Sequence, residues 1–355
     1  MASFPKKLLL LSGALVAACV LAELGLRLFA PVAVGISHQP CIYRRDAENG
    51  FAYVPGSRDR MQRFFEMDTV VQINADGCHD VERAAGAAAA FRVAAIGDSF
   101  TACLHVPIAD GWTQQLEHEL GRRRGAPGEV HNLGLDGTGT DVQVRLLAAV
   151  LARGQRFDTV ILAFYGNDVE DVALGPLYRE VVDGYVVTYQ DEAQRGAMLQ
   201  WLAAHRPSAW LAAAYRSSLL VRALCNTFGG SGLLRSNFVW PGQVGQEVHH
   251  RAPQAPLEQA CRDLATLAQR HGFRVLVVPV PARHDAMGSM KVLTQNLPAY
   301  ALQPFSVVDV VPAMERLLAD QQLTYQQLFW QHDDHLNATG NRLFAQALAE
   351  RMPPR

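Results

Sequence analysis

From residue 91 onward, short apolar segments alternate with segments of helical period, and this alternation limits the fold more than any other feature. The expected strands cover residues 91–96, 130–133, 158–165, 273–280 and 305–311. These segments are almost continuously apolar, whereas strands with one wet face alternate apolar and polar residues. Strands buried on both faces belong to parallel sheets covered by helices. The sequence therefore predicts a three-layer α/β/α domain around a five-stranded parallel sheet.

Helices are expected between these strands, and two of them end on recognisable stop signals. Residues 141–153 are strongly amphipathic and lead to Gly154, and residues 257–271 lead to Gly272. A glycine just beyond a helix is a common C-cap. Two further helices are expected over residues 112–124 and 339–352. In parallel sheets of this kind, ligands bind beyond the carboxyl ends of the strands, so functional residues are sought there.

The remaining sequence divides into an N-terminal segment, an extension and an insertion. Residues 31–90 form the extension, which contains an expected strand at 69–73 and ends in an alanine-rich linker at 84–90. Residues 91–355 form the main domain. An insertion at about 174–256 separates its third and fourth strands, and it either covers the edge of the sheet or packs separately. The insertion contains an expected hairpin at 178–189 and a helical stretch at 198–224.

Residues 1–30 have the features of a membrane-targeting segment. Two adjacent lysines precede an apolar run over residues 8–22, and apolar sequence resumes after Glu23. A bilayer span needs about 20 residues, a length that is reached only with the residues beyond Glu23. We expect an uncleaved signal anchor, with the rest of the chain extracytoplasmic, either periplasmic or at the cell surface, by the positive-inside rule. A cleaved signal peptide and lipidation at Cys19 are the alternatives.

Charge and cysteine pattern bear on other classes of function. The formal net charge is −2, from 32 basic and 34 acidic residues. There is neither a basic excess nor a basic stripe with interleaved aromatic residues, so no nucleic-acid partner is expected. The six cysteines include no Cys-x-x-Cys pair of the kind that binds zinc. Outside the cytoplasm disulfides are permitted, and Cys41–Cys78 is the pairing considered.

Motifs with polar residues and glycines follow the first three expected strands. Gly-Asp-Ser-Phe at 97–100 places the Ser99 hydroxyl at the end of a strand, where the start of a helix favours negative charge. Residues 131–139 contain glycines that leave backbone N–H groups accessible to an oxyanion. Tyr-Gly-Asn-Asp at 165–168 contains Asn167, whose amide can donate to the same oxyanion. Each motif also has an ordinary structural interpretation, as an N-cap, a glycine turn or an Asx cap.

The fourth motif, Asp333-Asp334-His335, precedes the last expected helix. A histidine oriented by a carboxylate is the base that a serine hydroxyl needs in order to act as a nucleophile, because the carboxylate fixes the tautomer and stabilises the imidazolium. The rival interpretation is a metal site built from these residues and His332. Neighbouring residues rarely converge on one ion, and no distant His or Cys set completes such a site. No metal and no cofactor are therefore expected.

Taken in order, the four motifs resemble those of the SGNH (GDSL-like) hydrolases, and the N-terminal segment resembles that of the membrane-anchored branch. The resemblance covers about residues 91–172 and 257–350. It implies a flavodoxin-like sheet with strand order 2-1-3-4-5, and it implies Ser99 as nucleophile with His335 as its base. It also implies an oxyanion hole formed by Ser99, Gly137 and Asn167.

The acid of the triad is the point at which the sequence departs from many members of that family. They place an aspartate three residues before the histidine, where this chain has His332. Other members use a two-residue step, which indicates Asp333 ahead of Asp334. The implied function is hydrolysis of O-acyl esters, foremost O-acetyl esters of a cell-envelope glycan or lipid, without a cofactor. The alternatives are an extracytoplasmic polysaccharide O-acetyltransferase and a non-catalytic envelope scaffold.

Overall fold

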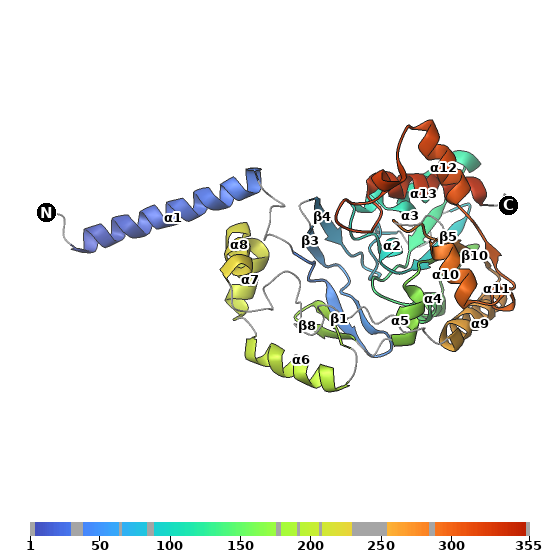
Figure 1. Ribbon diagram of the computed structural model, residues 1–355, viewed down its shortest axis with the longest axis horizontal. Coiled ribbons are helices and arrows are strands. Elements are labelled where there is room, and N and C mark those ends of the chain that lie inside the picture. Colours follow the sequence, from blue (N-terminus) through green and yellow to red (C-terminus); the bar gives the residue numbers. More distant parts are fainter. Residues whose placement is uncertain are drawn as a thin grey trace. The chain divides into compact units, whose positions relative to one another are not determined.

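The computed structural model describes residues 4–29, 38–63, 66–83, 89–174, 179–189, 192–205, 208–228, 254–283 and 288–352. The chain forms two compact units, whose elements are labelled in Figure 1. The first, here called the sheet unit, comprises Cys41–Asp59, Thr69–Gln190 and Glu247–Arg355. The second, here called the helical unit, comprises Met1–Pro40, Arg60–Asp68 and Asp191–Gln246.

The sheet unit is built on five parallel strands in the order β11-β10-β7-β5-β6 (Figure 1). Along the chain these are β5 (Arg92–Gly97), β6 (Glu129–Asn132), β7 (Thr159–Phe164), β10 (Arg274–Pro279) and β11 (Ser306–Val307). Read from β6, the order is 2-1-3-4-5. The predicted fold class and strand order are confirmed, because each expected strand takes its place in one parallel sheet.

Alternate residues of the central strands enter two separate hydrophobic cores. In β5, Val93 and Ala95 belong to one core, whereas Ala94 and Ile96 belong to the other. Fully burying a side chain such as valine or isoleucine contributes about 1.5–3 kcal/mol, so both faces stabilise the sheet. The first core includes α3 (Trp112–Arg124), α12 (Val311–Asp320) and α13 (Ala338–Arg351). The second includes α4 (Thr140–Ala152) and α9 (Gln254–His271).

The C-terminal half departs from the sequence-based expectation at the fifth strand. The expected strand at 305–311 is only two residues long, and α12 begins at Val311 with a proline in its first turn. Proline is well suited to the first turn of a helix, and a short apolar run does not by itself distinguish a buried strand from a buried helix. Three further helices are not apparent from the sequence pattern, namely α5 (Asp168–Leu174), α10 (Gly288–Asn296) and α11 (Ala299–Leu302).

Two antiparallel hairpins of the sheet unit lie side by side. β1 (Tyr43–Asp46) pairs with β2 (Gly50–Tyr53), and β8 (Arg179–Val182) pairs with β9 (Tyr185–Thr188), which is the expected hairpin at 178–189. Strands β1 and β2 both contact β8. The extension and the start of the insertion are thus packed together. The strand expected at 69–73 lies in β4 (Met67–Gln72), which pairs with β3 (Arg58–Arg63).

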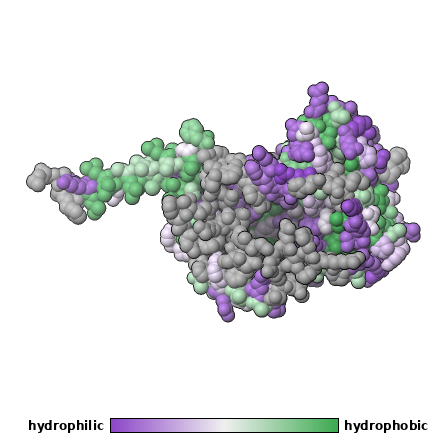
Figure 2. Space-filling model, viewed as in Figure 1, coloured by the Kyte–Doolittle hydropathy of each residue, from purple (hydrophilic) through white to green (hydrophobic). Residues whose placement is uncertain are grey.

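The helical unit contains α1 (Phe4–Phe29) and three helices of the insertion, α6 (Glu192–His205), α7 (Ala209–Ser217) and α8 (Leu219–Phe228). The helical stretch expected at 198–224 is therefore divided into three. Among the described residues, Pro5–Phe29 is the one stretch long and apolar enough to cross a membrane, and its most apolar window is entirely unburied. Figure 2 shows these apolar side chains along α1. A signal sequence has the same features.

The pairing considered between Cys41 and Cys78 is not formed. The structure contains no disulfide bond between these cysteines. The Cys41 thiol donates to the backbone oxygen of Asp183 at 3.0 Å, and burial raises the pKa of the Cys78 thiol to about 12. The alanine-rich linker expected at 84–90 lies largely outside the described residues.

Candidate active site

Ser99 is the first residue of α2 (Ser99–Ala102), immediately after β5. The Asp98 side chain caps this helix by accepting a backbone N–H at 2.9 Å. Gly97 allows the tight turn, because a Cβ there would lie 2.1 Å from the hydroxyl oxygen of Thr101. As the first residue of a helix, Ser99 has no helical partner for its own N–H. The turn therefore presents both the hydroxyl and the N–H of Ser99 at the carboxyl edge of the sheet.

His335 lies in the loop that precedes α13 and is hydrogen-bonded on both ring nitrogens. Its Nε2 lies 2.7 Å from Ser99 Oγ, and its Nδ1 lies 2.5 Å from Asp333 Oδ1. The same carboxylate oxygen accepts the backbone N–H of His335 at 2.9 Å. Asp334 faces another partner and forms an ion pair with Arg283 at 3.5 Å. The structure thus brings Ser99, His335 and Asp333 into one hydrogen-bonded series.

The electrostatics of Asp333 suit the role of an acid that orients a histidine. Burial works to raise the pKa of Asp333, but the hydrogen bond from His335 and the charge of that ring outweigh burial and hold the pKa well below its usual range. A carboxylate that stays ionised fixes Nδ1 as a donor and leaves Nε2 to accept the serine proton. The site therefore has the charge distribution that proton removal from Ser99 requires.

Two aromatic rings stack on the His335 imidazole. The His105 ring is nearly parallel to it, with centroids 3.7 Å apart and 18° between the planes, and the Phe100 ring lies 4.6 Å away at 28°. His105 is almost fully buried. It follows Ser99 by only six residues, which is the one signal in the sequence that could have pointed to it. The two rings limit the orientations that His335 can adopt.

Gly137 lies in the loop after β6, with φ of +65°. That left-handed conformation is easy for glycine and strained for other residues. The preceding residue, Asp136, accepts hydrogen bonds from the hydroxyls of Tyr43 at 2.8 Å and Tyr53 at 2.7 Å. Both tyrosines belong to the β1–β2 hairpin. The extension therefore holds the loop that carries Gly137, a role that no local pattern in the sequence indicates.

Asn167 follows β7 directly and lies near the same loop. Its amide Nδ2 donates to Asp171 Oδ2 at 3.3 Å, and Asp171 forms a short ion pair with Arg179 of β8. A Cβ at Gly137 would lie 3.5 Å from the Arg179 guanidinium carbon. Gly137 and Asn167 thus border one Asp–Arg pair. The structure places all three predicted oxyanion residues beyond the carboxyl ends of adjacent strands, β5, β6 and β7.

Two fully buried carboxyls support this part of the site. Burial raises the pKa of Asp98 to about 6, despite the Phe100 N–H and the positive charge of His335. Burial and the charge of Asp98 together raise the pKa of Asp168 well above its usual range. Asp168 accepts the Gln143 amide at 2.6 Å and the Tyr165 N–H at 2.7 Å. The Asp98 carboxyl next to Ser99 and the Asp168 carboxyl are therefore both harder to ionise than exposed carboxyls.

One group of described residues offers enough ligand atoms for a metal ion, namely His105, Asp333 and His335. Their ligand atoms lie within 4.8 Å of one another. A tetrahedral ion needs lone pairs that converge on one point, whereas the two imidazole planes differ by only 18° and Nε2 of His335 faces Ser99. The group fits a metal poorly as it stands. The four neighbouring residues 332–335 do not form a ligand set of their own.

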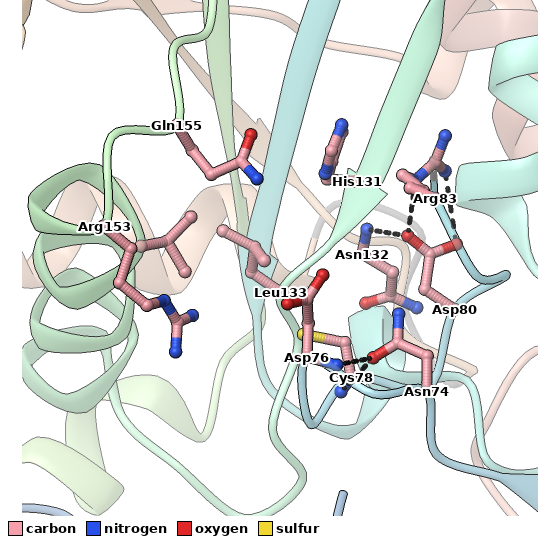
Figure 3. A pocket seen from close by; sticks show the side chains of 11 residues that line it. Asn74, Asp76, Cys78, Asp80, Arg83, His131, Asn132, Leu133, Arg153 and Gln155 are labelled. Atoms are coloured by element: carbon pink, nitrogen blue, oxygen red, sulfur yellow. Dashed lines mark hydrogen bonds and ion pairs between the residues drawn. The ribbon is translucent and has the colours of Figure 1, made fainter. Parts of the chain in front are cut away.

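A small cavity near β6 is a structural feature rather than a binding site (Figure 3). Its volume of about 30 Å³ suits a water molecule. Asp80 accepts from the Arg83 guanidinium at 3.1 Å and from the Asn132 N–H at 3.1 Å, and Asn74 Oδ1 accepts the Cys78 N–H at 2.9 Å. These polar groups bond one another. The network therefore fastens the loop after β4 to β6.

No protein-family model and no curated protein matches the chain. Solved structures do match over most of its length. A member of the lipolytic protein G-D-S-L family from Veillonella parvula DSM 2008 is 17% identical with a TM-score of 0.35, over 74% of this chain and 97% of that one. TesA is 15% identical with a TM-score of 0.41, over 73% and 97%. A catalytic mutant of Axe2, an acetylxylan esterase from Geobacillus stearothermophilus, is 14% identical with a TM-score of 0.39, over 74% and 94%. Because these similarities are distant, the activity is inferred from the geometry of the site alone.

Proposed function

We propose that this chain is a serine esterase that hydrolyses O-acyl esters, foremost O-acetyl esters. The observation that carries the proposal is the series from Ser99 Oγ to His335 Nε2 at 2.7 Å and from His335 Nδ1 to Asp333 at 2.5 Å. A serine, a histidine and a buried carboxylate in this arrangement form an activated nucleophile on many unrelated folds. No metal or cofactor is needed for that chemistry.

The reaction would proceed in two halves. Ser99 Oγ attacks the ester carbonyl carbon while His335 Nε2 takes the hydroxyl proton, and Asp333 stabilises the imidazolium. The N–H groups of Ser99 and Gly137 and the amide of Asn167 hold the oxyanion of the tetrahedral intermediate. The intermediate then breaks its bond to the alcohol, which leaves with the proton from His335. His335 then takes a proton from water as that water attacks the acyl-serine carbonyl carbon, and it returns the proton to Ser99 Oγ as the bond from Oγ to the acyl group breaks and the acid leaves.

The apolar helix α1 supports a proposal about the location and the substrate class. We propose that α1 is a membrane anchor and that the catalytic residues lie outside the cytoplasm, because Lys6 and Lys7 precede the apolar run. An anchored esterase would meet acylated glycans or lipids of the cell envelope. An O-acetyltransferase would use the same acyl-serine but pass it to a sugar hydroxyl. A non-catalytic scaffold would have no need of the three-residue series.

Hydrolysis of p-nitrophenyl acetate by the detergent-solubilised full chain tests this proposal. We expect activity that Ser99→Ala and His335→Ala remove, and that the matched control Ser306→Ala, at an exposed position in β11, retains. Loss of activity in the control alone, or full activity in Ser99→Ala, would contradict the assignment. Addition of an oligosaccharide acceptor separates the alternatives, since a transferase would form acetylated sugar in preference to acetate.

A further inference from the structure

The last turns of α1 carry a carboxylate that caps another helix of the helical unit. Glu23 accepts the backbone N–H of Leu219 at 3.2 Å and that of Leu220 at 2.8 Å, and it accepts the Ser218 hydroxyl at 2.8 Å. These N–H groups open α8, where no intrahelical partner exists for them. A carboxylate at this position also complements the positive end of the helix dipole. Glu23 therefore acts as the N-cap of α8 from a distant part of the chain.

A second charged side chain of α1 binds the adjoining end of α7. The Arg27 Nη2 donates to the carbonyl of Ser217 at 2.8 Å, and its Nε donates to Glu23 at 2.7 Å. Carbonyls at the end of a helix lack intrahelical partners and carry the negative end of the dipole. Glu23 thus binds the start of α8, and Arg27 binds the end of α7. The two residues that interrupt the apolar run of α1 are the ones that bind this corner.

The corner between α7 and α8 is stiffened by Arg222, which is 3% exposed. Its guanidinium donates to the carbonyls of Tyr215 at 3.2 Å and Arg216 at 2.9 Å, and to Gln62 Oε1 at 2.5 Å. Hydrogen bonds to a charged group are stronger than those between neutral groups, so the two to Tyr215 and Arg216 oppose separation of α7 from α8. We infer that α7 and α8 keep a fixed position on α1.

The length of α1 sets the depth of that corner in a bilayer. Glu23 follows Lys7 by 16 residues. At 1.5 Å per residue this is about 24 Å, which is less than the ~30 Å thickness of a hydrocarbon core. With Lys7 at the inner boundary, Glu23 lies just inside the outer boundary, and Arg27, which follows Lys7 by 20 residues, lies about 30 Å from it, at that boundary. The helices that Glu23 and Arg27 bind are then held at the outer boundary of the hydrocarbon core rather than in bulk water.

We propose that α7 and α8 form a platform that rests in the outer interface of the membrane spanned by α1. The platform exposes Trp210 in the first turn of α7, with 73% of its surface accessible, and Leu224 in α8, with 50%. Tryptophan is enriched at membrane interfaces, where its ring contacts acyl chains and its N–H contacts headgroups. This inference rests on the proposed anchor. It also implies that α1 is retained, because cleavage after it would remove both caps.

Quenching of tryptophan fluorescence by brominated lipids tests the platform. The full chain would be reconstituted into phosphatidylcholine vesicles with and without lipids brominated high on the acyl chain. We expect bromine to quench a share of the emission that disappears in Trp210→Phe and persists in the control Trp330→Phe. Equal quenching in Trp210→Phe and the unaltered chain would overturn the proposal.

Two additional measurements separate this result from the proposed anchor, and neither of them depends on esterase activity. Extraction at high pH in sodium carbonate would leave an anchored chain in the membrane pellet. Release of the chain would refute the anchor, whereas retention without quenching at Trp210 would refute the platform alone. Glu23→Ala removes the cap, so we expect weaker quenching with unchanged retention. Unaltered quenching in that variant would contradict the coupling of α1 to the platform.

Discussion

The imidazole rings of His105 and His335 are stacked face to face, with 3.7 Å between their centroids and 18° between their planes. When His335 accepts the proton of Ser99, the positive charge forms directly against the face of the second ring. The stack also restricts rotation of His335 away from Ser99. His105 is therefore expected to act as a positioning residue.

The variants His105→Ala and His105→Phe test whether the stacked ring matters, because the first removes the ring and the second keeps a ring at this position. We expect His105→Ala to lower kcat about 3- to 10-fold with KM unchanged, because the ring packing that orients His335 contributes about 0.5–1.5 kcal/mol. His105→Phe keeps a ring at this position and should remain within about twofold of the unaltered chain. Steady-state hydrolysis of p-nitrophenyl acetate provides the measurement. Equal losses in the two variants would show that a ring nitrogen, rather than the stack, matters.

Asp333 and Asp334 are neighbours with different partners, so they form a matched pair for substitution. Asp333→Asn removes the charge beside His335 Nδ1 and should lower kcat on the order of 10⁴-fold, as wrong orientation of the histidine tautomer does in serine proteases. Asp334→Asn weakens the ion pair with Arg283 and leaves the carboxylate beside His335 in place, and surface ion pairs contribute about 0–1 kcal/mol. Comparable losses in both variants, measured as kcat, would refute the assignment of the acid.

Asn167 is the one proposed oxyanion donor that a side-chain substitution removes. We expect Asn167→Ala to lower kcat by about 10²- to 10³-fold with a smaller effect on KM, because the donor acts on charge that develops in the transition state. Asn296→Ala is the control, since that amide donates to a carbonyl of its own helix at 2.9 Å. An Asn167→Ala enzyme with unchanged kcat would remove this residue from the oxyanion hole.

The Asp98 carboxyl makes stability depend on pH in a defined direction. Its pKa rises from 3.8 to about 6 on folding, so the protonated form is favoured in the folded chain. The stabilisation is complete below pH 4 and is lost as the pH rises through 6, by up to about 3 kcal/mol. Asp98→Asn stays neutral at every pH. In urea titrations at pH 4.5 and pH 8, we expect the free energy of unfolding of Asp98→Asn, relative to that of the unaltered chain, to be larger at pH 8. The same difference at both pH values would contradict this.

The positions of Ser99 and Asn167 were predictable from the sequence because each follows a strand that is almost continuously apolar. Parallel strands share one carboxyl edge, so the residues that follow them are brought to the same edge by topology. The structure adds the distances that single out Asp333 over Asp334. The apolar strands predicted the parallel sheet, whereas the strand order and the role of Gly137 were implied by the family resemblance.

Other features depend on contacts between distant segments that leave no local pattern. Tyr53 and Arg179 contact the loop around Gly137 from two different hairpins. The polar and apolar pattern of these short strands does not predict either contact. The fifth strand was overestimated because the apolar residues after Val307 serve the buried face of α12 equally well. The link from Glu23 to α8 joins residues almost 200 positions apart.

Covalent labelling with a fluorophosphonate tests whether Ser99 is an activated nucleophile, because that reagent phosphonylates an activated serine and needs no knowledge of the natural substrate. We expect a single adduct, mapped by mass spectrometry to Ser99 of the full chain, absent in Ser99→Ala and formed about 10²-fold or more slowly in His335→Ala. A folded chain without an adduct, an adduct on another serine, or undiminished labelling in His335→Ala would contradict this expectation.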